Sequence, residues 1–86
     1  MKALVIGLGE SGKGAAILLK HLNYQVIGVD RNLEDKNSLG ITLFLEGETL
    51  PFFDFDLIVL SPGIPLMHPL CKKAKERGIE VVGEAE

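Results

Sequence analysis

The chain has very little cysteine and no long apolar run, and each shortage excludes a class of protein. Among its 86 residues only Cys71 is a cysteine, so no internal disulfide can form, and a lone thiol fits a reducing compartment. The apolar run at the N-terminus is broken by glycines after a few residues and lacks a cleavage site, unlike a signal peptide. No segment approaches the roughly 20 apolar residues that a membrane span needs. We therefore expect a cytoplasmic protein with no membrane association.

Positive charge is scarce as well. Nine Lys and Arg against twelve Asp and Glu give a formal charge of −3, which argues against a nucleic-acid-binding surface. The basic residues of segment 72–77 recur at helical spacing and are typical of a solvated helix face. No metal-ligand cluster, carboxylate pair or nucleophile–base pair is visible, so we predict no catalytic residue and no metal site. The length supports one domain, too short for a complete enzyme.

Along the chain, segments with the apolar pattern of a strand alternate with segments that have the apolar pattern of a helix. A helix is predicted over Ser11–Leu22, with Ala15, Leu18, Leu19 and Leu22 on its apolar face and Asn23 just after its end. A second helix is predicted from His68-Pro69 to about Arg77, ended by Gly78, and Cys71 within it is expected to be a small buried hydrophobe. Continuously apolar segments, typical of parallel strands covered on both faces, predict five strands at residues 1–6, 24–29, 41–45, 57–60 and 79–82.

Strands that alternate with helices imply βαβ units with right-handed crossovers. We predict a Rossmann-like α/β domain over residues 1–86: a parallel five-stranded sheet in the order 3-2-1-4-5, with helices on both faces. The second crossover, residues 31–40, has room for at most a short helical turn around Leu33–Leu39. In the connection at 49–56, Phe52, Phe53 and Phe55 are expected to tuck under the sheet edge rather than to form an exposed patch.

The strongest motif is the glycine run Gly7–Gly12, which fits G-x-G-x-x-G between a predicted strand and a predicted helix. Gly7 would permit the tight turn, Gly9 would let the backbone approach a diphosphate, and Gly12 would allow close packing of the helix on the strand. The unpaired N–H groups of the helix would then face a phosphate at the positive end of the helix dipole. Ser11 either caps this helix or donates to a phosphate oxygen. Glu10 would repel phosphate, so we expect its side chain to point to solvent.

Two further places complete the predicted site. Asp30 ends the second strand, where its carboxylate suits hydroxyl or imide donors of a nucleoside, or merely begins a loop. Arg31 beside it either adds a bidentate contact or pairs with Glu34 at the surface. At the end of the fourth strand, Gly63 of the motif Ser61–Pro65 would bring a backbone N–H close to the ligand across the switch point of the sheet. His68, which precedes a proline at a helix start, is expected to be a cap rather than a catalyst.

Taken together, these motifs resemble one family, the N-terminal domain of UDP-N-acetylmuramoyl-L-alanine:D-glutamate ligases among the muramyl ligases. The resemblance covers the whole chain and is carried by segments Val5–Gly12, Val29-Asp30, Ser61–Pro65 with His68-Pro69, and Gly78–Glu84.

The resemblance implies that this domain holds the uridine diphosphate part of UDP-N-acetylmuramoyl-L-alanine in peptidoglycan synthesis. The diphosphate would meet the backbone at Gly9–Gly12, with Glu10 among them, and the Ser11 side chain. Asp30, with Arg31 or Asn32, would face the uridine, and Gly63 would contact the ligand from the other loop.

In the family, ATP phosphorylates the substrate carboxylate and the amine of D-glutamate attacks the acyl phosphate. Those steps use ATP, magnesium and further domains, so the resemblance implies a part of a ligase that is inactive alone and binds no cofactor itself. Its expected partners are the muramyl substrate and the remaining ligase domains, not nucleic acid or a membrane. Two other interpretations stay open: a nicotinamide-dinucleotide-binding module of an oxidoreductase or regulator, and a ligand-free interaction domain whose phenylalanines contact a partner.

Overall fold

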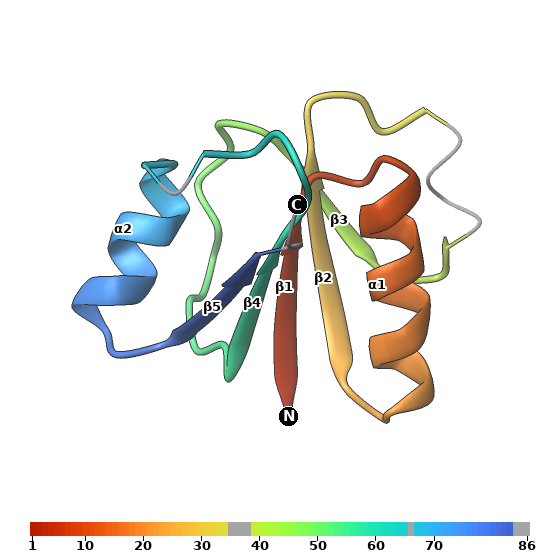
Figure 1. Ribbon diagram of the computed structural model, residues 1–86, viewed down its shortest axis with the longest axis horizontal. Helices are drawn as coiled ribbons and strands as arrows, with labels where there is room; N and C mark the ends of the chain where they lie inside the picture. Colours follow the sequence, from red (N-terminus) through yellow and green to blue (C-terminus); the bar gives the residue numbers. More distant parts are fainter. Residues whose placement is uncertain (35–38, 66, 84–86) are drawn as a thin grey trace.

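The computed structural model describes residues 1–34, 39–65 and 67–83, and its centre is a five-stranded parallel sheet (Figure 1). The strand order β3-β2-β1-β4-β5 and the parallel pairing confirm the predicted topology. The strand bounds lie within a residue or two of those expected: β1 (Lys2–Ile6), β2 (Gln25–Asp30), β3 (Thr42–Leu45), β4 (Leu57–Leu60) and β5 (Glu80–Gly83).

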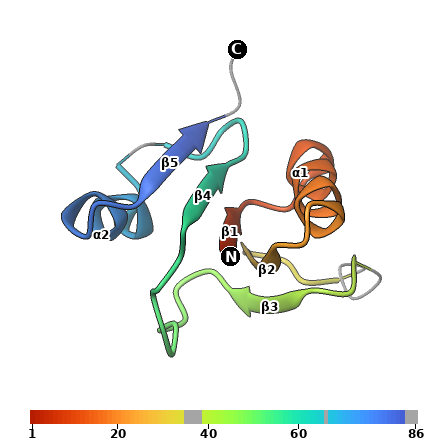
Figure 2. The ribbon, with the colours of Figure 1, turned by 90° about the horizontal axis from the view of Figure 1, so that it is seen from below.

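Two helices cover opposite faces of this sheet, as predicted. Helix α1 (Glu10–His21) joins β1 to β2, and α2 (Pro69–Glu76) joins β4 to β5; seen from below, they lie on either side of the sheet (Figure 2). Successive side chains of β1 point to alternate faces, so Val5 packs toward α1 whereas Leu4 and Ile6 pack toward α2. Both faces are buried, which explains why the strand sequence is apolar without alternation.

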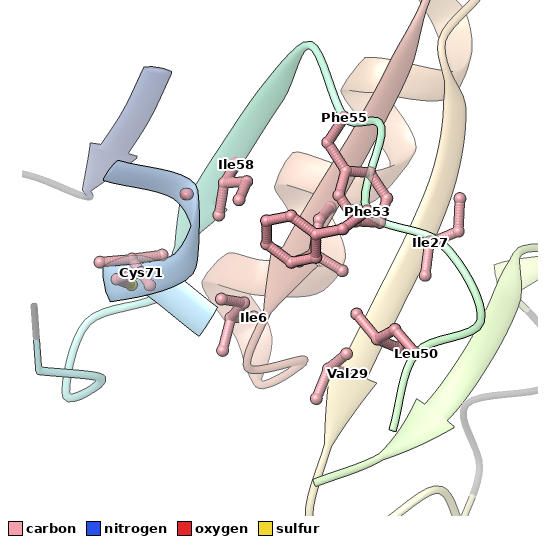
Figure 3. Packing of buried hydrophobic residues seen from close by; sticks show 11 residues of the cluster. Ile6, Ile27, Val29, Leu50, Phe53, Phe55, Ile58 and Cys71 are labelled. Carbon is pink, nitrogen blue, oxygen red and sulfur yellow. The ribbon is translucent and has the colours of Figure 1, made fainter. Parts of the chain in front are cut away.

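On the α2 face, the connection from β3 to β4 takes the place of a third helix. Its residues Leu50, Phe53 and Phe55 are buried against Ile27 and Ile58 of the sheet (Figure 3). The rings of Phe53 and Phe55 meet edge to face, with centroids 5.2 Å apart. The expectation that these phenylalanines tuck beneath the sheet is confirmed for Phe53 and Phe55, and the alternative of an exposed aromatic partner surface is wrong for them.

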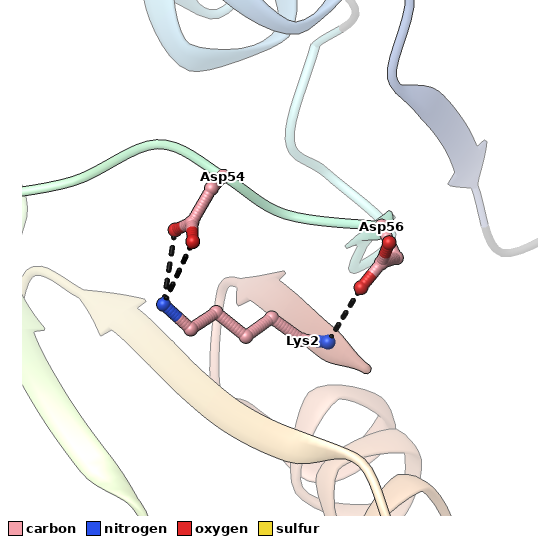
Figure 4. Close-up of polar contacts among 3 residues, drawn as sticks. All are labelled: Lys2, Asp54 and Asp56. Atoms are coloured by element: carbon pink, nitrogen blue, oxygen red, sulfur yellow. Dashed lines mark hydrogen bonds and ion pairs between the residues drawn. The ribbon is translucent and has the colours of Figure 1, made fainter.

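Lys2 fastens this connection to the first strand (Figure 4). Its backbone N–H donates to the Asp56 carboxylate at 2.8 Å, and the Asp56 N–H donates to the Lys2 carbonyl at 2.8 Å. Its ammonium group contacts both oxygens of Asp54, at 3.0 and 3.1 Å, and lies 4.3 Å from the centroid of the Phe52 ring. The start of β1 and the end of the connection are therefore held in register.

The helix ends follow the sequence closely. Asn23 and Gly78 have positive φ angles of 69° and 71° directly after the C-caps of α1 and α2, as predicted. His68 is the N-cap of α2, and Pro69 is its first residue. No helix in the described part of the chain is long and apolar enough to cross a membrane. The predicted helical turn at Leu33–Leu39 lies largely outside the described residues.

The predicted apolar face of α1 is wrong in part. Leu19 is buried as expected, but Leu18 and Leu22 are 59% and 58% exposed, and the line that meets the sheet is Gly12, Ala16 and Leu19. The close approach of Gly12 to the glycine loop determines which side of α1 faces the sheet. Leu18 and Leu22 then lie roughly 80–120° around the helix from Gly12.

Candidate functional site

A hollow of about 320 Å³ lies where the carboxyl ends of β1, β2, β3 and β4 meet. The loop after β1 leads to one face of the sheet and the loop after β4 to the other, which makes this the switch point of the fold. The hollow is lined by Gly7, Gly9, Glu10, Ser11, Gly12, Asp30, Arg31, Glu46, Ser61, Pro62 and Ile64.

Two of the glycines are required by the geometry of the loop. Gly7 has a φ of +89°, and its N–H donates to the Val29 carbonyl at 2.8 Å, which closes the turn against β2. A Cβ atom at Gly12 would lie 1.9 Å from the Gly7 carbonyl oxygen and 2.6 Å from Ser61 Oγ. The predicted roles of Gly7 in the tight turn and of Gly12 in close helix packing are confirmed.

The first turn of α1 directs unpaired amides at the hollow. Its first backbone hydrogen bond runs from Lys13 N–H to the Gly9 carbonyl, at 2.8 Å. Within residues 1–34, 39–65 and 67–83, the N–H groups of Glu10, Ser11 and Gly12 have no protein acceptor. The partial positive charge of the helix N-terminus therefore faces the hollow.

Ser11 does not cap α1. The N-cap residue is Gly9, and no side chain forms a capping hydrogen bond at this end of the helix. Ser11 is exposed in the first turn of α1 and lines the hollow. The alternative that Ser11 is the cap is therefore wrong. Glu10 is exposed, as expected, but it also lines the hollow.

Asp30 holds the glycine loop to the sheet. One oxygen of its carboxylate accepts from the Leu8 N–H at 2.5 Å and the other from the Asn32 N–H at 3.0 Å. Leu8 is fully buried, so this bond satisfies an amide that water cannot reach. The loop-building interpretation of Asp30 is confirmed, while its predicted contact with a nucleoside stays a prediction.

The structure brings six of the eight predicted site residues together and leaves two outside the lining. Gly63, with a φ of +92°, lies between the lining residues Pro62 and Ile64 but is not itself among them. Asn32 is also absent from the lining; its side chain accepts from the Glu34 N–H at 2.9 Å. The six residues that meet are Gly9, Glu10, Ser11, Gly12, Asp30 and Arg31.

Five residues of the lining were not predicted as ligand contacts from the sequence: Gly7, Glu46, Ser61, Pro62 and Ile64. Ser61, 8% exposed, donates from its hydroxyl to the Gly7 carbonyl at 2.5 Å and so joins the loops after β1 and β4. Glu46 follows β3, and its carboxylate lies 2.6 Å from Nε2 of His68. The predicted cap role of His68 is confirmed, because its Nδ1 accepts from the Leu70 N–H at 3.1 Å. Ser61 begins the motif Ser61–Pro65, of which only Gly63 was predicted to contact the ligand; for Glu46 the sequence offered no signal.

Cys71 lies outside the hollow, in helix α2. Cys71 is 5% exposed and packs in the core beneath α2, where burial raises the pKa of its thiol, so its predicted role as a small hydrophobe is confirmed. Among the residues that the structure describes, no three His, Cys, Asp or Glu side chains gather in a group that could hold a metal ion.

The sheet order, the tight glycine turn and the amides at the switch point define a Rossmann-like α/β domain. Residues 1–83 match the family model described as "Mur ligase MurD-like, N-terminal domain". The chain therefore belongs to the MurD-like Mur ligase family, as the N-terminal domain.

Similar proteins agree with this assignment. The UDP-N-acetylmuramoylalanine–D-glutamate ligase of Protochlamydia amoebophila is 47% identical over 99% of this chain and 21% of that protein. The ligase of the same name from Aquifex aeolicus is 45% identical over 100% of this chain and 18% of that protein. The chain thus spans about a fifth of the length of these curated relatives.

Two solved structures share the fold. The UDP-N-acetylmuramate–alanine ligase MurC of Thermotoga maritima superposes with a TM-score of 0.68 at 23% identity, over 96% of this chain and 20% of that one. A conserved protein of unknown function from Silicibacter pomeroyi gives a TM-score of 0.74 at 20% identity, over 95% of this chain and 34% of that one.

Proposed function

We propose that this domain binds the UDP portion of UDP-N-acetylmuramoyl-L-alanine for an ATP-dependent ligase that adds D-glutamate in peptidoglycan synthesis. Family membership supports the choice of substrate, because relatives that match the whole chain carry the name of that ligase. Neither of the two ligases named above is a nicotinamide-dinucleotide-binding protein by its name.

The observation that carries the proposal is the set of unpaired amides at the start of α1, which border a hollow at the switch point of the sheet. Backbone N–H groups at a helix N-terminus are a ready site for a phosphate. The diphosphate would bind across Gly9–Gly12 with the Ser11 hydroxyl as an added donor. The uridine would extend toward Asp30 and Arg31, with Asn32 and Gly63 at the margin of the hollow.

The ligation chemistry belongs to the rest of the ligase. ATP and magnesium would be bound by its remaining domains, which are partners of this one. The domain contributes by holding and orienting the substrate, and we propose that the 86 residues alone do not catalyse ligation.

Titration of the ¹⁵N-labelled domain with UDP tests the proposal. We expect the largest amide shifts at Gly9–Gly12 and Arg31, and weaker or no saturation with NADH. Gly9→Ala is the sharpest variant, because Gly9 lines the hollow with a negative φ of −71° and its added Cβ would meet nothing within 4 Å. The variant should fold and lose UDP affinity.

Gly14→Ala is the matched control for that variant. It adds the same methyl group five residues further along the chain, within α1, again with no atom within 4 Å, and Gly14 does not line the hollow. UDP shifts confined to another surface, or equal affinity of Gly9→Ala and Gly14→Ala, would contradict the proposed site.

A further inference from the structure

Glu46 is a carboxylate of the hollow that the glycine fingerprint does not account for. Its backbone N–H donates to the Asp30 carbonyl at 2.9 Å, which extends the β2–β3 ladder and places Glu46 beside the end of β2. Its side chain is 34% exposed and lines the hollow next to the end of β3. In the sheet, β3 lies two strands away from β1, whose end leads to α1.

His68 determines how this carboxylate is oriented. The ring nitrogen Nδ1 accepts from the Leu70 N–H, so the ring proton lies on Nε2 and is donated to Glu46 Oε2 at 2.6 Å. The imidazole is only 10% exposed and is held through both nitrogens. The other carboxylate oxygen of Glu46 has no protein partner in the described ranges, 1–34, 39–65 and 67–83.

Asp30, the acid expected to meet the nucleoside, is placed differently. Each of its carboxylate oxygens already accepts a backbone N–H, from Leu8 and from Asn32, and these bonds build the loops around it. Glu46 therefore offers the hollow an acceptor oxygen that loop construction does not use, and His68 keeps it in one orientation.

We propose that Glu46, positioned by His68, accepts a hydrogen bond from a hydroxyl or imide N–H of the bound nucleoside and so selects a nucleoside diphosphate over a simple diphosphate. This inference rests on the proposed function, because a diphosphate at the start of α1 directs the nucleoside across the end of β2 toward β3. Glu46 is a specificity-determining residue, and His68 is a positioning residue.

The test is to measure the affinities of UDP and of inorganic pyrophosphate for the wild-type domain and for Glu46→Gln. His68 Nε2–H requires an acceptor, so the new amide turns its oxygen to His68 and its NH₂ group into the hollow. We expect UDP affinity to fall about tenfold to a hundredfold, the range for a hydrogen bond to a charged group. Pyrophosphate should bind equally well or more tightly, since one negative charge is gone. Glu76→Gln, the same change at an exposed position near the end of α2, is the control.

Two variants of His68 separate positioning from stability. In His68→Asn the new side chain is a good N-cap but is too short to reach Glu46. In His68→Gln the longer side chain can donate its amide N–H to Glu46, as Nε2 of His68 does. We expect the preference for UDP over pyrophosphate to drop in His68→Asn and to persist in His68→Gln. Titrations of the wild-type domain with two analogues identify the group that donates to Glu46: 2′-deoxy-UDP lacks the ribose 2′-hydroxyl, and N3-methyl-UDP lacks the imide N–H. The analogue without the donor should bind the wild-type domain as weakly as UDP binds Glu46→Gln.

The outcomes distinguish the two proposals. Equal or tighter UDP binding by Glu46→Gln overturns the role of Glu46 and leaves the proposed function standing, provided that wild-type UDP shifts still map to Gly9–Gly12. Absence of UDP binding by the wild-type domain overturns both.

Discussion

Gly12 and Gly14 lie two residues apart in α1, but a methyl group would meet different surroundings at each. At Gly12 the Cβ would overlap the Gly7 carbonyl oxygen at 1.9 Å, a backbone atom that cannot move without opening the turn. We expect Gly12→Ala to lower the free energy of unfolding by about 3 kcal/mol. Gly14→Ala meets no atom within 4 Å and should raise it by about 0.5–1 kcal/mol, because alanine is the better helix former. Urea unfolding of both variants measures the difference, and equal stabilities would refute the tight contact.

Asp30 provides a second prediction at the scale of the residue. Asp30→Ala removes the acceptor of the Leu8 N–H, which lies in a fully buried residue, and leaves that amide unsatisfied. We expect a loss of about 1–3 kcal/mol of unfolding free energy. Hydrogen exchange at the Leu8 amide should accelerate more than at amides in the middle of β1, such as Leu4. Unchanged exchange at Leu8 would show that Asp30 does not hold the glycine loop.

At the scale of the element, local chemistry was sufficient for the ends of helices and strands. Left-handed Asn23 and Gly78 end α1 and α2, and Pro69 begins α2, because these residue types suit those backbone positions wherever they occur. The side of α1 that faces the sheet was not predictable from its own periodicity. It depends on a contact with Gly7, which only the folded loop brings into place.

The connection between β3 and β4 is the element whose attachment responds to pH. The Lys2 ammonium, which donates to Asp54, holds the pKa of that carboxyl below its usual value of 3.8. A carboxyl whose pKa is lower in the folded state stabilises the fold above about pH 3.8, and this contribution is lost as the pH falls through the folded-state pKa. In Lys2→Met the pKa of Asp54 should move up toward 3.8, as followed by the NMR shift of its side-chain carboxyl carbon. An unchanged titration would mean that the exposed pair does not persist in solution.

For the whole molecule, the sheet order was predictable because alternating strand and helix patterns with right-handed crossovers leave few topologies. The glycine loop was predictable as well, because a G-x-G-x-x-G motif indicates a phosphate-binding turn only where it lies between a strand and a helix, and this one lies between β1 and α1. The Glu46–His68 contact could not be foreseen, because it joins β3 to α2 across 22 positions of sequence and neither residue belongs to a motif that requires the other. Long-range pairs of this kind are created by the fold and leave no local pattern.

The hollow borders loops that follow four different strands, so a ligand bound there should stabilise the fold as a whole. A ligand that binds only the folded state at a concentration of 100 times its Kd adds about 2.7 kcal/mol, and in a domain of this size each kcal/mol raises Tm by about 4–8 °C. Saturating UDP should therefore raise the Tm of the domain by on the order of 10–20 °C in a thermal unfolding experiment. Uridine at the same concentration should raise it far less, because it has no phosphate for the amides of Glu10, Ser11 and Gly12. Equal shifts with UDP and uridine would place the anchoring contacts at the nucleoside end, and the helix N-terminus would lose its role as the diphosphate site.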